Sequence, residues 1–456
     1  MTGPTSNELT LETLTRMMRD RGVERLFYKC LAPNDNSKNQ IYLGGELSVI
    51  SAIPSGELSE EESTSRKPTS ARRQRLKAPV PLFWLDAEGS IHSAPGAQLI
   101  LYPQYPEVRL SGFLQGSSIR LGAWFDPRKD GRAPGRVLLL GVSRDGSVYG
   151  HLAIPSSSLA RQVTQAISLG SFGALNELKF GEDDGTLKLL TELCRIHRMG
   201  WITGRRLDAM GLSHPCNSPN CGGYTLEAEL EITPNGFSEP DYLGWEVKTF
   251  SVADFARIES QVTTLMTPEP DGGIYKDAGV EAFIRRFGYP DTMGREDRLN
   301  FGGTHFAGIT HPRTGLRIEI TGYDMQSGKI ADVNGGIALL AGDECAALWT
   351  HRKLIDHWKR KHDRAVYIPN KNQTNLVRRY HYGSEAMLGR GADFALLLKA
   401  VSARHVYYDP GIKIENASGG RPRVKRRSQF RIKVGHLGML YREFERKALC
   451  ADMSNP

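Results

Sequence analysis

Near the N-terminus, the spacing of hydrophobic residues changes over short distances from one that predicts a helix to one that predicts strands. Residues 10–21 place Leu11, Leu14 and Met17–Met18 on one stripe, which predicts an amphipathic helix. Arg25–Cys30 then predicts a strand, and Gln40–Leu43 predicts a second, shorter strand. Residues 33–39 between them are dense in Asn, Asp and Ser, which favour turns by hydrogen bonding to their own backbone.

The pattern from residue 55 to residue 154 indicates a loop followed by a β-rich region. Residues 55–78 are acidic first and basic afterwards, with little that could enter a core, so we expect an exposed or disordered loop. From Pro81 to Ile154, short apolar runs such as VPLFWL and RVLLLGV are broken by Gly and Pro. That pattern is typical of a small β-rich domain.

Helical periods become prominent beyond residue 155. Thr186–Met199 and Asp343–Lys361 each begin at a capping residue and carry an apolar stripe, so both predict helices. Mixed strands and helices fill the rest of this part. We therefore predict a β-rich N-terminal domain over 1–165 and an α/β (α+β) domain over 166–456.

Length and composition limit the classes of protein that fit. The chain has 456 residues, enough for two or three domains, with 39% hydrophobic and 24% charged residues, which excludes global disorder. No apolar run approaches about 18 residues, which argues against a membrane span. The mixed, polar N-terminus argues against secretion, and six unevenly spaced cysteines do not make a disulfide framework. We expect a protein of the reducing cytoplasm.

Positive charge is concentrated at one end of the chain. The formal net charge is +8, but residues 351–456 carry 23 Lys and Arg against 9 Asp and Glu, while the rest carries 36 against 42. A concentrated basic region favours a polyanionic ligand such as nucleic acid. A solvated basic surface remains the alternative.

The most informative stretch surrounds a short strand. Leu243–Phe250 (LGWEVKTF) alternates with period two, which places Glu246 and Lys248 on one face and Trp245 and Val247 on the other. Asp241 lies where the chain enters this strand. Two carboxylates, the Val247 carbonyl and waters suit an octahedral Mg²⁺, which would activate a phosphate and a water, and Lys248 would orient that water.

This Asp…Glu-x-Lys arrangement is found in metal-dependent nucleases. A Glu-x-Lys on a strand is also common as an exposed ion pair, so the triplet by itself leaves both interpretations open.

A longer series of motifs resembles one family. Tyr224-Thr225-Leu226-Glu227, Pro234-Asn235-Gly236, Glu239–Tyr242 and Gly244–Lys248 together resemble the MvaI/BcnI family of type II restriction endonucleases. The resemblance extends from about residue 185 to 446 and includes the C-terminal stretch Tyr407–Ile432. It implies a PD-(D/E)xK, MutH-like mixed-sheet nuclease domain.

The resemblance also implies site roles and partners. Asp241 and Glu246 match the metal-binding carboxylates, Lys248 the catalytic lysine, and Glu227 a further acidic residue carried on a preceding helix. The implied cofactor is Mg²⁺, with Mn²⁺ as a substitute. The implied substrate is double-stranded DNA with a short C/G-rich site, and a cognate DNA methyltransferase would act in the same system without a stable complex.

Further residues are candidates for DNA contact. The basic segment Arg421–Arg431 offers several side chains that bind guanine or phosphate, and Gln429 could read adenine. His305, His311 and Arg313 could reach a groove or a phosphate. Each has a structural alternative, a solvated loop or a satisfied core histidine. The candidates in the basic segment are Arg421, Arg423, Arg426, Arg427, Gln429 and Arg431.

His214, Cys216 and Cys221 (HPCNSPNC) superficially resemble zinc ligands. No fourth ligand follows at a suitable spacing, so we predict free cysteines in a loop.

Two questions remain open at the level of sequence. The N-terminal domain is interpreted as an accessory DNA-recognition domain, with oligomerisation or regulation as alternatives. The whole chain is interpreted as a restriction endonuclease, with a MutH-like nicking repair enzyme and a DNA-binding protein with a lapsed nuclease site as alternatives.

Overall fold

The computed structural model describes residues 9–33, 40–45, 48–62, 74–105, 107–126, 132–180, 185–218, 220–233, 241–359, 364–374 and 376–450. The chain forms two compact units. The first comprises Met1–Glu192 and Phe237–Trp245, and the second comprises Leu193–Gly236 and Glu246–Pro456. The first segment of this unit ends at Glu192, whereas the sequence-based prediction placed the domain boundary at 165/166.

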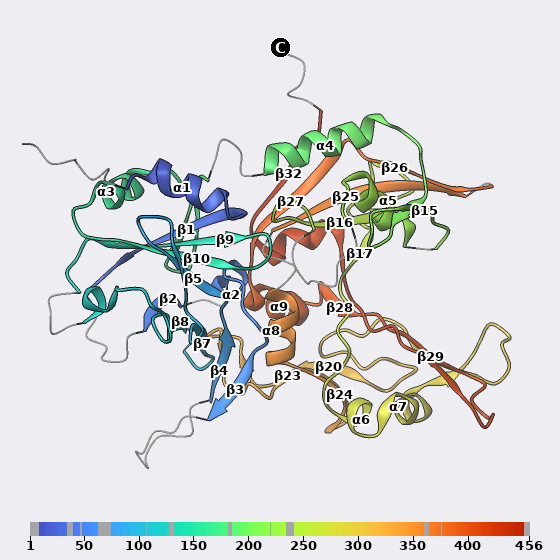
Figure 1. Cartoon of the computed structure of the whole chain (residues 1–456). Helices are drawn as coiled ribbons and strands as arrows, with labels where there is room; N and C mark the ends of the chain where they lie inside the picture. Colours follow the sequence, from blue (N-terminus) through green and yellow to red (C-terminus); the bar gives the residue numbers. More distant parts are fainter. Residues whose placement is uncertain are drawn as a thin grey trace, which may run out of the picture. The chain divides into compact units, whose positions relative to one another are not determined.

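The first unit is mainly β-structure, with short helices (Figure 1). Its helices are α1 (Leu11–Arg19), α2 (Ser48–Ala52) and α3 (Ser158–Gln165), and helix α4 (Thr186–Arg198) begins in it. Its strands are β1 (Val23–Leu31), β2 (Ile41–Gly44), β3 (Ser59–Glu62), β4 (Gln74–Pro79), β5 (Leu82–Leu85), β6 (Ile91–Ser93), β7 (Gln98–Tyr102), β8 (Glu107–Ser111), β9 (Arg136–Ser143), β10 (Val148–Ala153), β11 (Ser168–Phe172) and β12 (Leu175–Leu178).

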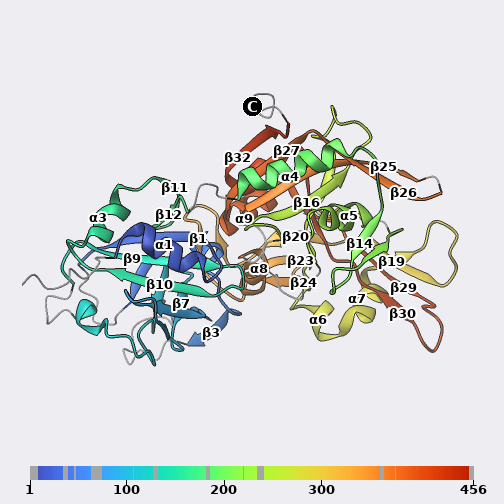
Figure 2. The same cartoon turned by 45° about the horizontal axis from the view of Figure 1, so that its top comes forward.

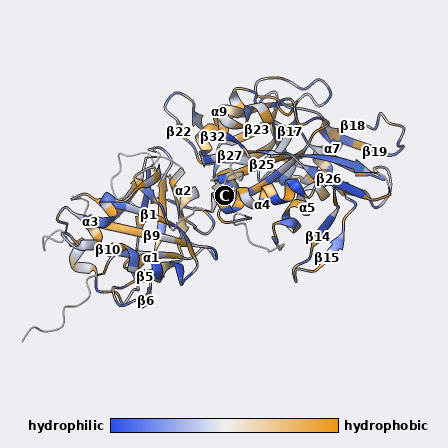
Figure 3. Ribbon diagram, turned by 90° about the horizontal axis from the view of Figure 1, so that it is seen from above, coloured by the Kyte–Doolittle hydropathy of each residue, from blue (hydrophilic) through white to orange (hydrophobic). Residues whose placement is uncertain are grey.

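Two sheets share the core of this unit. One has the order β11-β12-β1-β9-β10-β5-β6 and the other has the order β2-β8-β7-β4-β3. Helices α1 and α3 cover the same face of the first sheet, where Leu14, Met18 and Val163 pack on Leu26 and Leu139 (Figure 1). Strand β9 is buried along almost its whole length, and Figure 3 shows it in the hydrophobic colour. The hydrophobic pattern therefore gave the β-rich character of this region correctly.

A buried ion pair fastens strand β12 to strand β1. Arg25 donates from Nε to Glu177 Oε1 at 2.9 Å and from Nη2 to Oε2 at 3.2 Å, and only 5% of the Glu177 side chain is exposed. The guanidinium also lies over the rings of Phe27 and Phe172, 4.8 and 5.2 Å from their centroids. Bidentate contact and aromatic stacking are both specific to arginine.

The second unit contains the remaining elements (Figure 2). Its helices are α5 (Cys221–Glu229), α6 (Ile274–Asp277), α7 (Gly279–Phe287), α8 (His351–Lys359) and α9 (Phe394–Ser402). Its strands are β13 (Ile202–Thr203), β14 (Arg205–Leu207), β15 (Ser213–Pro215), β16 (Glu246–Ser251), β17 (Val262–Met266), β18 (Tyr289–Pro290), β19 (Arg298–Gly302), β20 (Arg317–Ile320), β21 (Tyr323–Asp324), β22 (Lys329–Ile330), β23 (Gly336–Ala341), β24 (Glu344–Thr350), β25 (Arg364–Thr374), β26 (Arg378–Tyr382), β27 (Glu385–Ala392), β28 (Val406–Tyr408), β29 (Gly411–Glu415), β30 (Arg423–Lys425), β31 (Phe430–Lys433) and β32 (Tyr441–Ala448).

A mixed sheet organises the second unit. Its order is β13-β26-β25-β27-β32, and β16 pairs in parallel with the long strand β25, from Glu246 beside Ala365 to Ser251 beside Asn370. Strands β25 and β26 extend together as a hairpin (Figures 1 and 2). Residues Ala365–Ile368 of β25 are fully buried, so the strand that carries the Glu-x-Lys triplet is fixed to the centre of a core. The α+β fold expected from the sequence is the fold observed.

The predicted helix over 343–361 is only half correct. Its first half is strand β24, which follows β23 through a hairpin turn at Gly342 and Asp343, and the helix α8 begins only at His351. Gly342 has φ of 61°, a conformation that suits a two-residue hairpin turn. A glycine-aspartate pair between two apolar runs was the sequence signal for this hairpin.

The predicted loop over 55–78 contains strands β3 and β4, which pair with each other; residues 63–73 lie outside the described residues. Glu61 forms ion pairs with Arg75 and Lys77 of the opposite strand. The acidic and basic halves that suggested a loop are thus cross-strand partners.

The predicted strand over 243–250 begins later, at Glu246. Leu243 and Gly244 have φ of 47° and 80°, and Tyr242 and Trp245 exchange backbone hydrogen bonds across this tight turn. Trp245 is fully buried and Val247 is 8% exposed, so the prediction that these two face the core is confirmed. In the described part of the chain, no helix is both long and apolar enough to cross a bilayer.

We predict that Glu177→Gln lowers the stability of the first unit by about 3 kcal/mol, because it removes the buried negative charge that the Arg25 guanidinium contacts through both carboxylate oxygens. Scanning calorimetry of the whole chain should show the transition of this unit shifted to lower temperature.

Glu24→Gln is the matched control. It removes a pair with Arg144, whose side chain is 77% exposed, and should cost no more than about 1 kcal/mol. Equal shifts for the two variants would contradict the assigned importance of Arg25–Glu177.

Candidate active site

Strand β16 presents Glu246 and Lys248 together. Residues two apart in a strand share a face, and Lys248 Nζ donates to Glu246 Oε1 at 2.9 Å. Glu246 is 4% exposed and the Lys248 side chain 16% exposed, so this pair is largely shielded from water. The alternative interpretation of this triplet was an exposed ion pair, and the low exposure of both side chains argues against it.

The second carboxylate oxygen of Glu246 is not satisfied. Oε2 is buried and has no hydrogen-bond partner among the described residues. A buried acceptor without a partner costs about 1–3 kcal/mol, and more when it is charged. The arrangement therefore leaves a carboxylate oxygen available to a ligand.

Buried tyrosines lie beside the pair. Tyr367 of β25 is the register partner of Lys248, and its hydroxyl lies 2.7 Å from the Tyr441 hydroxyl. Burial raises the pKa of Tyr367, while the ammonium of Lys248 opposes that rise. The two hydroxyls thus give Glu246 and Lys248 a neutral, hydrogen-bonded environment at neutral pH.

A hard divalent cation fits the donors that the strand offers. Carboxylate and carbonyl oxygens, here Glu246 Oε2 and the backbone of Val247, are the ligands that Mg²⁺ takes. Within the described ranges, no cluster of three or more His, Cys, Asp and Glu side chains could hold a metal. The unpartnered oxygen of Glu246 is therefore the observation that favours a cation here.

Asp241 lies five residues before Glu246, the first residue of β16, and is half-buried. It belongs to the segment Phe237–Trp245, which is part of the first compact unit, whereas Glu246 opens the continuation of the second. The convergence of Asp241 with Glu246 and Lys248 thus stays a prediction. Of the motifs that resemble the family, Pro234–Gly236 and Glu239–Pro240 lie outside the described residues.

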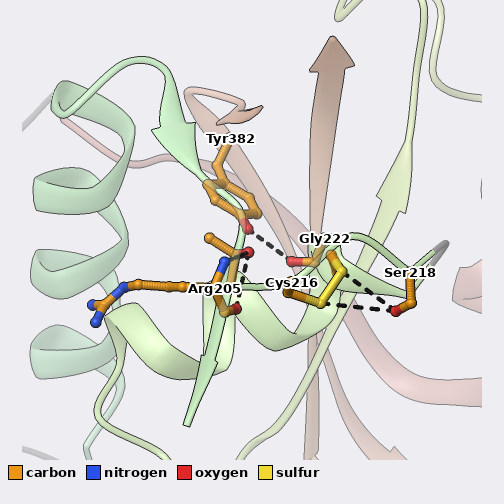
Figure 4. Close-up of a disulfide and its surroundings, with 7 residues drawn as sticks. Arg205, Cys216, Ser218, Gly222 and Tyr382 are labelled. Carbon is orange, nitrogen blue, oxygen red and sulfur yellow. Dashed lines mark hydrogen bonds between the residues drawn. A yellow bond between two sulfur atoms is a disulfide. The ribbon is translucent and has the colours of Figure 1, made fainter. Parts of the chain in front are cut away.

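Helix α5 carries Glu227, as the sequence predicted. The Glu227 side chain is half-buried, and its Oε1 would lie 3.8 Å from a Cβ at Gly223, one turn earlier. The helix packs against β16 and β14, and the buried Glu229 on it accepts from Arg205 Nε at 2.8 Å. Tyr382 donates to the Gly222 carbonyl at 2.7 Å and fixes the first turn (Figure 4). Helix α5 is therefore firmly held beside the strand that bears Glu246.

The cysteine prediction was wrong. Cys216 and Cys221 are joined by a disulfide at the start of α5, with Ser218 hydrogen-bonded to both sulfurs (Figure 4). A second disulfide joins Cys194 and Cys450, 256 positions apart. The sequence could not show the second pairing, because only the fold brings α4 beside the end of β32. His214 lies with Asp208 instead, at 2.7 Å.

The basic segment places its candidates in different environments. Arg421, Arg423, Arg426 and Arg427 are exposed, on and beside the hairpin of β29 and β30. Arg431 is half-buried and donates to Asp409 at 2.6 Å. Gln429 is only 5% exposed and accepts from Arg427, so its side chain serves the local packing.

His305 and Arg313 also differ. His305 is fully buried, with Nδ1 3.0 Å from the Gly303 carbonyl and Nε2 2.9 Å from Thr314 Oγ1. Its ring stacks on half-buried His311 at 4.4 Å. Arg313 is exposed and lies over the Tyr289 ring. Of these three, Arg313 is the side chain that is presented to solvent.

Comparisons with known proteins place these residues in context. The model of the MvaI/BcnI restriction endonuclease family matches residues 190–441, a range that contains Glu227, Asp241, Glu246 and Lys248. The comparison with curated proteins returned no match.

Three solved structures show low similarity. A restriction endonuclease MvaI–cognate DNA substrate complex has 19% identity and a TM-score of 0.42 over 58% of this chain and 98% of that chain. MvaI in the absence of DNA has 18% identity and a TM-score of 0.32 over 57% and 96%. The B3 domain of the UbaLAI restriction endonuclease with cognate DNA has 20% identity and a TM-score of 0.17 over 37% and 97%.

We predict that His305 makes the chain acid-sensitive. Burial, then the neighbouring His311, lowers the pKa of His305 to about 4. As pH falls through about 6.5, the unfolded chain takes up this proton first, so stability falls between about pH 6.5 and 4. The full loss is about 3 kcal/mol.

Urea unfolding at pH 7 and pH 4.5 measures this loss. In His305→Gln, whose amide does not titrate, the difference between the two pH values should shrink. His214→Gln, at an exposed position, is the control. An undiminished pH difference in His305→Gln would contradict the assignment.

Proposed function

Because this chain belongs to the MvaI/BcnI restriction endonuclease family, it is a site-specific DNA endonuclease, and we propose that it is a Mg²⁺-dependent type II enzyme cutting double-stranded DNA at a short C/G-rich site. The observation that carries the proposal is the buried carboxylate of Glu246, with one oxygen on Lys248 and the other without a hydrogen-bond partner in the part of the chain that the structure describes. Purely structural carboxylates are normally satisfied on both oxygens when they are buried.

We assign the metal to the oxygens of Asp241 and Glu246 and to the Val247 carbonyl, with Mn²⁺ as a substitute for Mg²⁺. When bound, the cation would polarise the scissile phosphate. Family motifs support the same assignment for Asp241, which ends the Glu-Pro-Asp stretch.

Lys248 is assigned to the attacking water. Its ammonium donates to Glu246 Oε1, and the rigid strand fixes where the side chain leaves the backbone. There it orients the water and stabilises negative charge that develops on the phosphate. Glu227, on the adjacent helix α5, is assigned as a further acidic residue of the site.

The phosphate group stays bonded to the DNA throughout the reaction. A water oxygen forms a bond to phosphorus, in line with the bond to the 3′ oxygen, which breaks. The 3′ oxygen leaves as a hydroxyl after protonation, and the phosphate remains on the 5′ end.

DNA contact is assigned to exposed cations. Arg421, Arg423, Arg426 and Arg427 form a basic surface suited to phosphates and guanine edges. Arg313 is a further candidate. We assign the β-rich N-terminal region, residues 1–165, to accessory DNA recognition and residues 166–456 to the nuclease.

The biological setting follows from the activity. A cognate methyltransferase would protect host DNA without forming a stable complex with this chain. We propose a cytoplasmic location, where that DNA lies.

Digestion of a long unmethylated DNA of known sequence tests the proposal. With Mg²⁺ the purified chain should produce discrete fragments whose sequenced ends share one short site, and chelation should stop the reaction. Nicks that require partner proteins would favour the MutH-like alternative. Binding without any cleavage would favour a lapsed site.

Variants test the residue roles. Asp241→Asn, Glu246→Gln and Lys248→Met should each lower the cleavage rate by at least about 100-fold, because each removes a charge that acts in the transition state. DNA affinity, measured by gel shift, should change little.

Lys353→Met is the matched control, since it removes an exposed lysine of α8. Glu227→Gln should fall between the control and the three site variants. Wild-type cleavage by Asp241→Asn would remove Asp241 from the site.

A further inference from the structure

A cavity of about 430 Å³ opens between the two sheets of the first unit. Its walls come from the ends of β1 and β9 in one sheet and from β2 and the chain after β8 in the other. Its volume lies in the range of small-molecule sites, about 300–1,000 Å³. The mouth of a two-sheet sandwich or barrel is a common place for such a site.

The lining combines cations with aromatic rings. Lys29, Arg132 and Arg136 contribute positive charge, Tyr42 and Phe125 contribute rings, and no Asp or Glu is among the described residues that line the cavity. The charges of the described lining residues are therefore all positive, which favours an anion.

Arg136 is an unusual buried charge. It is 2% exposed, and its guanidinium donates to three backbone carbonyls, those of Ala133, Trp124 and Ala32, at 3.0, 2.7 and 3.3 Å. Its described contacts include no carboxylate. An arginine stays charged when it is buried, and buried charges are normally paired with an opposite charge. Among the described residues, the guanidinium beside the cavity is therefore held by carbonyl oxygens and by no carboxylate.

Lys29 breaks an inward-facing apolar row. On strand β1 it stands between Phe27 and Leu31, which are 0% and 6% exposed and share its face. Its ammonium lies 5.7 Å from the centre of the Tyr42 ring, and burial lowers the pKa of Lys29. A lysine at an inward position destabilises the core, because its charge is partly removed from water. We therefore take Lys29 as an indication that a ligand binds here.

We propose that this cavity binds a nucleotide, with the phosphate held by Lys29 and Arg132 in the field of Arg136, and the flat base against the rings of Tyr42 and Phe125. Stacking between aromatic side chains is how proteins hold a base that has left the helix. The nucleotide is either free in solution or extruded from DNA, and only the second source rests on the proposed function.

Isothermal titration of the full-length chain with the four deoxynucleoside 5′-monophosphates tests the site. At least one should bind with a Kd of about 10–100 μM, as expected for a ligand of about 20 heavy atoms. The matching nucleosides and inorganic phosphate should each bind at least about tenfold more weakly. If no monophosphate binds, or phosphate alone binds equally well, the nucleotide site is overturned.

Substitutions test whether the ligand binds in the cavity or only responds to the positive charge of the protein surface. Lys29→Met should weaken the monophosphate at least about tenfold without lowering the melting temperature, since it removes a half-buried ammonium whose desolvation carries a cost. Lys179→Met removes an exposed lysine of the same unit and should leave binding unchanged. Tyr42→Leu provides a second variant and should weaken the monophosphate more than it weakens phosphate. Equal effects of Lys29→Met and Lys179→Met would contradict the site.

Chemical probing distinguishes the two sources. On DNA bound without Mg²⁺, permanganate and chloroacetaldehyde should mark one unpaired base with the wild type and none with Lys29→Met if the nucleotide is extruded. Monophosphate binding without such a mark supports the free nucleotide. Cleavage activity is measured in parallel: cleavage without nucleotide binding removes this site alone, and nucleotide binding without cleavage removes the proposed function alone.

Discussion

The parallel pairing of β16 with β25 is the constraint on which the candidate site depends. Because Ala365–Ile368 of β25 are fully buried, the six residues of β16 are held in one register against a rigid partner. Period two along that strand then leaves Glu246 and Lys248 on one face, with Val247 turned to the other. A shift of the register by one residue would exchange the faces, so that Glu246 and Lys248 would lose their present surroundings.

Burying Glu246 carries an energetic cost that the surroundings offset only in part. Lys248 neutralises the charge and satisfies Oε1, while Oε2 is left without a partner among the described residues. Such incomplete satisfaction is typical of sites that await a ligand, since a fully satisfied pair would have nothing to offer. The same reasoning applies to Arg136 in the first unit, where carbonyl oxygens hold the guanidinium but no described carboxylate balances it. Arg25 with Glu177 shows the contrasting case of a buried pair that is complete.

The local hydrophobic pattern correctly predicted elements that have a regular apolar stripe or whose packing partners lie close in sequence. The helix at Leu11–Arg19, the strand predicted at Arg25–Cys30 and the buried Trp245 were all predicted correctly. The errors share a cause: β24 and the β3–β4 pair were missed because strand pairing with a neighbour outweighed a helical or loop-like pattern. In each case a hairpin partner decided the state of the segment.

The sequence by itself supplied the residue types of the triplet and their spacing, and its resemblance to the family implied that Glu227 lies on a helix. Residue type and spacing are local properties of the chain. Only the tertiary structure decided which groups are shielded from water, because burial depends on chain segments far apart in sequence. It turned His305 into a core residue, enclosed Gln429, joined Cys194 to Cys450 and left Glu246 Oε2 unpartnered. How far a residue is shielded from water depends on contacts from the whole fold, so a short stretch of sequence does not determine it.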